Sequence, residues 1–175
     1  RINRLIWYSN KMINGVLVTH NLRSTHNVGS LLRTAEGLGV NKVYLTGYTP
    51  YPNSNDDARL PHESAKLTKQ IQKTALGAEE YIDWEHNTDI FKVIEELRTN
   101  SYSIVGLEQL PGAVQLSEYT PTDKVALILG REVEGLESEV ADLCDTIIEI
   151  PMRGKKESFN VVQAAAMALY SMMYR

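Results

Sequence analysis

Residues 15–39 read GVLVTHNLRSTHNVGSLLRTAEGLG, and this stretch sets the fold expected for the whole chain. It opens with a short β-branched apolar run from Gly15 to His20, which is typical of a buried strand. A polar loop follows, and from Asn27 onward apolar residues recur at helical spacing: Val28, Leu31, Leu32, Ala35 and Leu38. Asn27 is the expected N-cap of this helix, and Gly37 or Gly39 is its expected end. The segment therefore predicts a strand, a loop and a helix.

The rest of the chain repeats this alternation. Further strands are expected at Lys42 to Thr46, Glu80 to Trp84, Ser103 to Leu107, Lys124 to Leu129 and Thr146 to Ile150. Helices are expected at Glu63 to Leu76, Asp89 to Thr99, Glu137 to Leu143 and Ser158 to Tyr174. Apolar strands that alternate with helices predict an α/β fold whose mostly parallel sheet is flanked by helices on both faces. The long polar loop from Gly47 to Pro61 is typical of a lid or a partner-binding element.

Length and composition indicate one globular domain over residues 1–175. The chain is 43% hydrophobic and 23% charged, which is ordinary for a soluble protein. One cysteine and four histidines exclude an intramolecular disulfide and a zinc module, so no metal site is expected. No apolar run approaches the roughly 20 residues of a membrane span, and no signal peptide is recognisable, so a cytoplasmic location is expected. Because the chain begins at Arg1 and not at a methionine, an additional segment before residue 1 stays a possibility.

The common catalytic fingerprints are missing from the sequence. There is no G-x-G-x-x-G after a strand, no G-x-x-x-x-G-K-[ST] and no G-x-S-x-G, which argues against dinucleotide oxidoreductases, P-loop NTPases and α/β-hydrolases. Cys144 is expected to be a small buried side chain. His20 and His26, taken singly, are expected to be packing or loop residues rather than general bases.

Three polar loops remain, and each follows a predicted strand. They read NLRSTHNVGSLLRTA (21–35), GREVEGL (130–136) and IPMRGKKESFN (150–160). Open α/β sheets bind their ligands at the carboxyl ends of the strands, so the loops are expected to form one crevice. Helix caps, salt bridges and turns could explain each loop alone, but not their joint occurrence. Arg33 lies about 200° around the helix from Leu31, off the buried stripe.

In order and spacing these loops resemble the three motifs of the SpoU/TrmH family of SPOUT (α/β-knot) RNA methyltransferases. The first follows N-x-R-x-x-x-N-x-G-x-x-x-R-x-A, the second G-x-E-x-x-G after an apolar strand, and the third I-P-M-x-G-x-x-x-S-L-N. The resemblance runs from Asn21 to the C-terminus. Its one departure is Phe159, where the family usually has leucine, and this departure is expected to alter packing rather than chemistry.

The resemblance implies a C-terminal trefoil knot and binding of S-adenosylmethionine without a metal, since the methyl group of a sulfonium is already activated. The residues that match the family's cofactor site are Leu107, Gly130, Ile150, Met152 and Phe159. The implied reaction is methyl transfer to a ribose 2′-hydroxyl of RNA. The lack of an RNA-binding appendage favours tRNA over rRNA as the substrate.

The resemblance also implies a catalytic set built around Arg33. In the family the matching arginine is proposed to assist deprotonation of the hydroxyl, but a guanidinium with a pKa above about 12 is a better phosphate clamp than base. Both roles stay open. The residues expected to position Arg33, the ribose and the cofactor are Asn27, Glu132, Ser158 and Asn160. Those expected to contact RNA phosphates, despite a net charge of −4, are Arg23, Arg131, Arg153, Lys155 and Lys156.

A homodimer is the expected assembly, since family members are dimers whose RNA site is built across both subunits. Apolar side chains cover more of the C-terminal helix than one buried stripe needs: Val161, Val162, Ala165, Ala168, Leu169, Met172 and Met173. No membrane partner is expected. Three alternatives stay open: a catalytically silent RNA-binding or assembly protein on the same fold, a base-methylating SPOUT enzyme, and a nucleotide-binding metabolic enzyme.

Overall fold

The computed structural model describes residues 13–54 and 57–174, and in them strands and helices alternate as predicted. The strands are β1 (Asn14–His20), β2 (Lys42–Thr46), β3 (Trp84–Asn87), β4 (Ser103–Leu107), β5 (Val114–Gln115), β6 (Lys124–Leu129) and β7 (Thr146–Glu149). The helices are α1 (Thr25–Leu38), α2 (Pro61–Ala75), α3 (Ile90–Thr99), α4 (Ser138–Ala141) and α5 (Val161–Met173), with a short 3₁₀ helix η1 (Ala78–Glu80).

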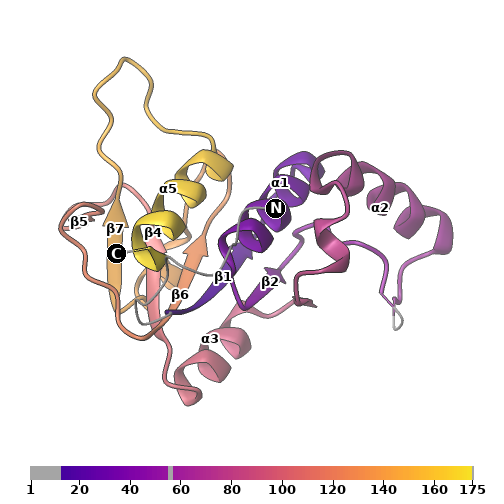
Figure 1. Ribbon diagram of the computed structural model, residues 1–175, viewed down its shortest axis with the longest axis horizontal. Helices are drawn as coiled ribbons and strands as arrows, with labels where there is room; N and C mark the ends of the chain where they lie inside the picture. The colour runs from indigo at the N-terminus through magenta and orange to yellow at the C-terminus, as the bar shows by residue number, and fades with distance from the viewer. Residues whose placement is uncertain (1–12, 55–56, 175) are drawn as a thin grey trace, which may run out of the picture.

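The seven strands form one sheet in the order β3-β2-β1-β6-β4-β7-β5 (Figure 1). Every neighbouring pair is parallel, which confirms the predicted sheet. All carboxyl ends therefore lie at the same edge. The chain winds outward from β1 to β2 and β3, then crosses to β4 on the other side of β6. Such a reversal opens a crevice at the carboxyl edge, which is where sheets of this kind bind ligands.

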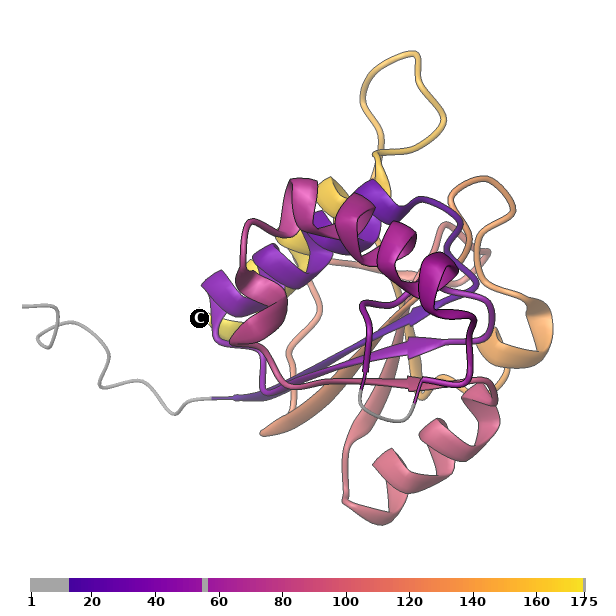
Figure 2. The same cartoon turned by 90° about the vertical axis from the view of Figure 1, so that its right-hand side faces the viewer.

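Helices cover both faces of the sheet (Figure 2). On one face α1, α2 and α5 enclose a core that includes Leu17, Leu31 and Leu169. On the other face α3 and α4 pack over side chains such as Val18 and Ile128. Successive side chains of a strand point to opposite faces, so a strand that is buried on both faces must be apolar throughout. This requirement explains the uninterrupted apolar runs of β1 and β6.

Helix α1 packs directly against the backbone of α2 at Gly29. A Cβ atom on Gly29 would overlap the carbonyl oxygen of Ile71 and the hydroxyl of Thr74. The Thr74 hydroxyl also donates a 2.9 Å hydrogen bond to the carbonyl of His26. The glycine of the first motif therefore serves helix packing, and this packing fixes where the amino end of α1 meets the sheet edge.

Several predicted boundaries were wrong. Helix α1 is capped by Ser24, whose hydroxyl accepts a 3.2 Å bond from the N–H of Asn27, so Asn27 is not the N-cap. Gly39 ends the helix at φ 75°, as expected. Residues 80–83 do not form the predicted strand, since the end of η1 and a turn occupy them, and β3 starts only at Trp84. Helix α5 starts after Asn160.

Two further results concern the described part of the chain only. Strand β5, too short to be read from the sequence, adds an edge strand beside β7. Across residues 13–54 and 57–174, no helix has the length and apolar character needed to cross a bilayer.

Candidate functional site

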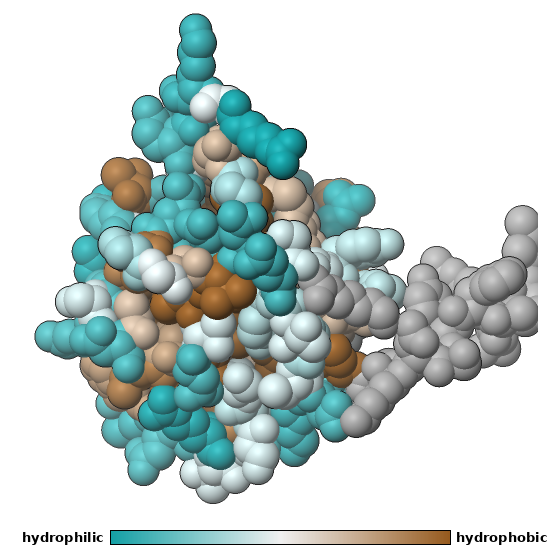
Figure 3. Space-filling view, turned by 90° about the vertical axis from the view of Figure 1, so that its left-hand side faces the viewer, coloured by the Kyte–Doolittle hydropathy of each residue, from teal (hydrophilic) through white to brown (hydrophobic). Residues whose placement is uncertain are grey.

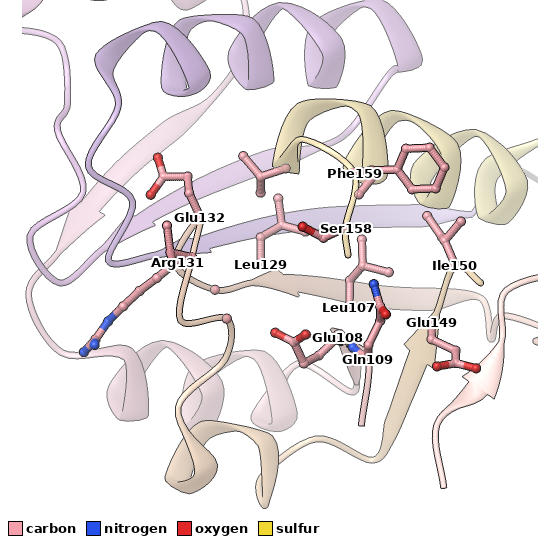
Figure 4. Close-up of a pocket in the computed structure, with 15 residues that line it drawn as sticks. Leu107, Glu108, Gln109, Leu129, Arg131, Glu132, Glu149, Ile150, Ser158 and Phe159 are labelled. Carbon is pink, nitrogen blue, oxygen red and sulfur yellow. Dashed lines mark hydrogen bonds between the residues drawn. The ribbon is translucent and has the colours of Figure 1, made fainter. Parts of the chain in front are cut away.

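A pocket lies where the chain leaves β4, β6 and β7, beside the start of α5 (Figure 4). Its residues include four of the five predicted cofactor contacts: Leu107, Gly130, Ile150 and Phe159. The fifth, Met152, is half-buried in the 150–160 loop but does not line the pocket. The pocket wall combines apolar side chains with backbone of the 130–136 loop. This is the place where the sequence predicted a crevice.

The 130–136 loop is a tight turn that only glycine permits at two positions. Arg131 and Gly135 exchange backbone hydrogen bonds of 3.0 and 3.1 Å. Gly135 has φ 74°, in the left-handed region. A Cβ on Gly130 would overlap the backbone of Gly135 and Leu136. The glycines of the second motif therefore let the loop fold back on itself at the pocket.

Glu108 secures the same loop from the adjacent strand and was missed by the sequence analysis. One oxygen of its carboxylate accepts a 2.9 Å bond from the N–H of Leu136, and the other accepts a 2.8 Å bond from the N–H of Gln109. The signal available in the sequence was a carboxylate directly after the buried strand Ser103–Leu107. Because Glu108 also lines the pocket, it contributes negative charge there.

Glu132 links the second motif to the first. Its carboxylate accepts hydrogen bonds from the backbone N–H groups of Ser24 (3.0 Å) and Arg23 (3.2 Å) and from the side-chain amide of Asn27 (3.2 Å). Figure 4 shows the side chain pointing toward the start of α1. Burial alone would raise the pKa of Glu132, but these donors outweigh burial and hold its pKa below the ordinary value. The carboxylate is therefore ionised at neutral pH, beside a helix N-terminus that favours negative charge.

The third motif joins this cluster through Asn160. Its side-chain amide donates a 3.4 Å bond to the side-chain oxygen of Asn27, and its own oxygen caps α5 by accepting a 2.9 Å bond from Val162 N–H. Ser158 is exposed and lines the pocket. The structure thus brings together four of the five predicted catalytic residues. Arg33 is separate, since it is exposed on α1 and does not line the pocket.

Asn21, at the end of β1, belongs to the first polar loop, but no role was predicted for it. It adopts φ 56°, which asparagine tolerates better than most residues. Its amide donates a 2.9 Å bond to Glu137, and its oxygen accepts a 3.1 Å bond from the N–H of Tyr48. The neighbouring His20 is buried, and burial keeps its pKa below the ordinary value. Asn21 therefore ties together the ends of β1 and β2 and the start of α4.

The predicted RNA-contacting residues fall into two groups. Arg153, Lys155 and Lys156 are exposed on the loop between β7 and α5, which projects from the molecule and forms the hydrophilic tip at the top of Figure 3. Arg23 is exposed at the sheet edge and pairs with Glu134 at 3.1 Å. Arg131, by contrast, points away from the pocket and binds the Glu137 carboxylate. The guanidinium of Arg131 therefore anchors the 130–136 loop and is not a free surface cation.

An apolar groove runs between α1 and α5 on the outside of the molecule. It is lined by Thr34, Gly37, Leu38, Ala166, Met167 and Tyr170. Tyr170 is 61% exposed and its ring stacks on that of Tyr174 at 5.2 Å. The buried side of α5 carries Ala165, Ala168, Leu169 and Met172, and the partly buried Val161, Val162 and Met173 also pack against the core. The apolar side chains of α5 that face outward are instead Met167 and Tyr170. The groove adjoins Arg33 through its neighbour Thr34.

No group of three or more histidine, cysteine or acidic side chains with the arrangement of a metal site occurs in the described residues. Cys144 is half-buried, and burial raises its pKa to about 12. It therefore stays protonated at neutral pH.

Comparison with known families and proteins agrees with these features. The model of the SpoU rRNA Methylase family matches residues 14–170. A Staphylococcus aureus protein, named for the TrmH family of tRNA/rRNA methyltransferases, is 31% identical over 155 residues, which are 89% of this chain and 56% of that protein. A similarly named Staphylococcus haemolyticus protein is 30% identical over 91% of this chain and 58% of its own length. The chain thus spans little more than half of these relatives.

Solved structures share the fold at lower identity. An AdoMet-bound rRNA methyltransferase from Sinorhizobium meliloti superposes with a TM-score of 0.78 at 21% identity, over 91% of this chain and 56% of that chain. The TrmH/SpoU tRNA modifying enzyme of A. aeolicus gives a TM-score of 0.73 at 22% identity, over 93% of this chain and 74% of that chain. The chain therefore shares its fold with these solved structures over more than nine-tenths of its length.

Substitution of Gly130 tests whether the closed 130–136 loop forms the pocket. In Gly130→Val the side chain would overlap the backbone of Gly135 and Leu136, so the loop opens. Isothermal titration should then detect no binding of S-adenosylmethionine, the cofactor expected from the sequence, while the circular dichroism spectrum stays that of a folded protein. Gly154→Ala is the control, because a Cβ there meets nothing within 4 Å. Unchanged cofactor affinity in Gly130→Val would contradict the assignment.

Proposed function

Because this chain belongs to the SpoU rRNA Methylase family, we propose that it transfers the methyl group of S-adenosylmethionine to a ribose 2′-hydroxyl of RNA. The observation that carries the proposal is the hydrogen-bonded cluster of Glu132, Asn27 and Asn160, which joins all three motifs beside one pocket. A ribose hydroxyl, rather than a base nitrogen, is favoured by the arginine of the first motif and the Ser-Phe-Asn of the third.

The pocket suits a ligand that is both apolar and cationic. Leu107, Ile150 and Phe159 offer apolar contact for an adenine ring, and backbone groups of the 130–136 loop offer hydrogen bonds. Glu108 and Glu132 both line the pocket, so their negative charges lie close to a bound ligand and favour positive charge there. S-adenosylmethionine, when bound, supplies an activated methyl group on a cationic sulfonium.

The chain's own residues would then orient the acceptor ribose. Ser158 is exposed and lines the pocket, so its hydroxyl can hydrogen-bond a sugar. Asn160 is exposed two residues further on, and its amide can bind a sugar in place of its 3.4 Å bond to Asn27. Glu132 and Asn27 hold the start of α1 against the pocket, so they act as positioning residues. Preorganised polar groups of this kind lower the barrier because they need no reorganisation during the reaction.

Arg33 does not line the pocket of its own chain, and we infer that it acts in the pocket of a second subunit. The apolar groove between α1 and α5 offers a surface for dimerisation, and Arg33 sits at its margin, next to Thr34. In a two-fold dimer both copies of this groove meet at one interface. We assign Arg33 to the pocket of the partner subunit, where its guanidinium would clamp the phosphate next to the target ribose or assist loss of the hydroxyl proton.

The proposed RNA contacts follow the exposed basic side chains. Arg153, Lys155 and Lys156 on the projecting loop, together with Arg23, would bind phosphates. Arg131 is reassigned to supporting the loop through Glu137. We favour tRNA over rRNA as the substrate and the cytoplasm as the location.

A trefoil knot at the C-terminal end is also part of the proposal. Residues 108–113 connect β4 to β5, although β7 lies between these two strands. Leu107 and Val114 are both level with Ile148 of β7, so this short connection crosses the path by which the chain leaves β7. The side chain of Gln109 donates a 3.0 Å bond to the carbonyl of Glu157 on the departing loop. This contact supports a threaded arrangement.

The function is tested by methyl transfer to RNA that lacks the modification. S-adenosylmethionine should bind in a titration with or without chelator, and labelled methyl should enter bulk tRNA isolated from cells without this gene. A ribose 2′-O-methyl group blocks alkaline cleavage, so the label should appear in alkali-resistant dinucleotides. Label in ordinary mononucleotides would instead mean base methylation. Binding of RNA without any transfer would mean a catalytically silent protein.

Replacement of Arg33 tests its catalytic role. Arg33→Ala should leave the melting temperature and cofactor affinity nearly unchanged, because the side chain is exposed. Single-turnover methyl transfer should nevertheless fall by on the order of a hundredfold, as when a transition-state charge stabiliser is lost. Arg33→Lys separates the roles: strong inactivation means that the planar fork is needed, and substantial activity means that charge suffices. Lys156→Ala, the control, should weaken RNA binding and its salt dependence only.

A mixed dimer of two inactive chains tests whether Arg33 acts across the interface. One chain carries Arg33→Ala and the other Gly130→Val, so only one of the two composite sites keeps both an arginine and a pocket. Purified heterodimers should regain about half of the wild-type rate if the subunits share sites in a two-fold arrangement. Heterodimers as inactive as either parent would show that Arg33 serves its own chain or none.

A further inference from the structure

Tyr48 is a half-exposed aromatic residue on a rigid backbone, at the carboxyl end of β2. The residue is 51% exposed. Its N–H donates a 3.1 Å bond to the side chain of Asn21, and the preceding carbonyl of Gly47 lies 3.1 Å from the ring nitrogen of His86. Gly47 has φ 67°, and a Cβ there would overlap Asn21. The turn that presents Tyr48 is therefore fixed by residues of the site already described.

The remainder of this loop also packs on itself. The ring of Tyr51 stacks on that of His86 with centroids 3.8 Å apart, and the guanidinium of Arg59 lies 3.5 Å from the centroid of Tyr51. Arg59 is further held by Asp57. These side chains are used inside the loop, whereas Tyr48 is an exposed residue. The predicted partner-binding loop thus offers one exposed aromatic surface next to the pocket side of the sheet.

A cation lies beside this ring. The turn lies against the segment that precedes Arg23, because the N–H of Leu22 donates a 3.1 Å bond to the hydroxyl of Thr49. The guanidinium of Arg23 interacts electrostatically with the Tyr48 side chain and pairs with Glu134 at 3.1 Å. The backbone N–H of Arg23 is one of the donors to Glu132, so Tyr48 and Arg23 adjoin the catalytic cluster directly. Both partners of the Arg23 and Glu134 pair are exposed, with 64% and 44% of their side chains accessible. Exposed ion pairs of this kind contribute little to stability, so an RNA phosphate can replace Glu134 as the partner of Arg23.

We propose that Tyr48 stacks on a nucleobase of the RNA substrate while Arg23 binds the adjoining phosphate. The inference rests on the proposed function in one respect, that the substrate is RNA. Unpaired bases are recognised chiefly by stacking on aromatic rings, and a neighbouring cation binds the backbone of the same nucleotide. A ring held still before binding loses little entropy on contact. The pair thereby selects RNA with a splayed-out base at the target site.

The test compares Tyr48→Ala with Tyr48→Phe in RNA binding. The probe is bulk tRNA from cells lacking the gene, titrated in filter binding with saturating S-adenosylhomocysteine so that no chemistry intervenes. Tyr48→Ala should weaken binding about tenfold or more, whereas Tyr48→Phe, which keeps the ring, should stay within about twofold. The slope of affinity against salt should not change in Tyr48→Ala, but Arg23→Ala should reduce it by about one ion.

Tyr81→Ala is the matched control, since Tyr81 is 79% exposed and precedes β3, whereas Tyr48 follows β2. Because β2 and β3 are parallel, the two tyrosines lie at opposite ends of the strands. It should bind RNA as the wild type does. Cofactor affinity and melting temperature should be unchanged in all of these variants. Wild-type RNA affinity in Tyr48→Ala, or equal loss in the phenylalanine and alanine variants, would overturn the proposal.

This experiment can fail independently of the proposed function. If the wild-type chain binds tRNA but methylates a base, the ribose assignment is wrong while the stacking role of Tyr48 stands. If ribose methylation is found and Tyr48→Ala binds RNA normally, only the role of Tyr48 is wrong. If the wild-type chain binds no RNA, both are overturned.

Discussion

The carboxylate of Glu132 is the contact on which the geometry of the site depends. It accepts two backbone N–H groups and one side-chain amide at the start of α1, and it belongs to a loop that also forms the pocket wall. Hydrogen bonds to a charged group contribute about 1.5–3 kcal/mol each, more than neutral ones. The same carboxylate binds the N–H of the N-cap residue Ser24, one of the groups that a helix start otherwise leaves without a partner. One side chain therefore fixes the first motif against the second.

The remaining contacts extend this constraint across the sheet edge. Asn27 is hydrogen-bonded to Asn160 of the third motif. Glu108 binds the far end of the 130–136 loop, and Asn21 binds the turn that follows β2. The parallel sheet makes this arrangement accessible, because every strand delivers its loop to the same edge. Polar side chains that satisfy one another in this way stay in place before a ligand arrives, which is the requirement for electrostatic stabilisation of a transition state.

The sequence predicted the fold well because the fold is encoded locally. A strand buried on both faces must be apolar throughout, so β1, β2, β4, β6 and β7 were recognisable from short runs of residues. The site was predicted less completely because its contacts are long-range. Ser24 and Asn27 are both good N-caps, and what decides between them is Glu132, 105 residues from Asn27. The roles of Glu108 and Asn21 depend on backbone groups that become neighbours only after folding, and the sequence pattern alone does not show that Arg131 turns to Glu137.

Amide hydrogen exchange in Glu132→Ala, compared with the wild type, measures whether this carboxylate holds the start of α1 in place. If the carboxylate holds the start of α1, the peptide covering residues 22–28 should exchange at least about tenfold faster in the variant, since one charge-assisted bond lost corresponds to that factor. The peptide covering residues 124–129, in β6, should be unaffected. S-adenosylmethionine affinity should fall in parallel with the faster exchange. Unchanged exchange at residues 22–28, together with unchanged cofactor affinity, would contradict the account.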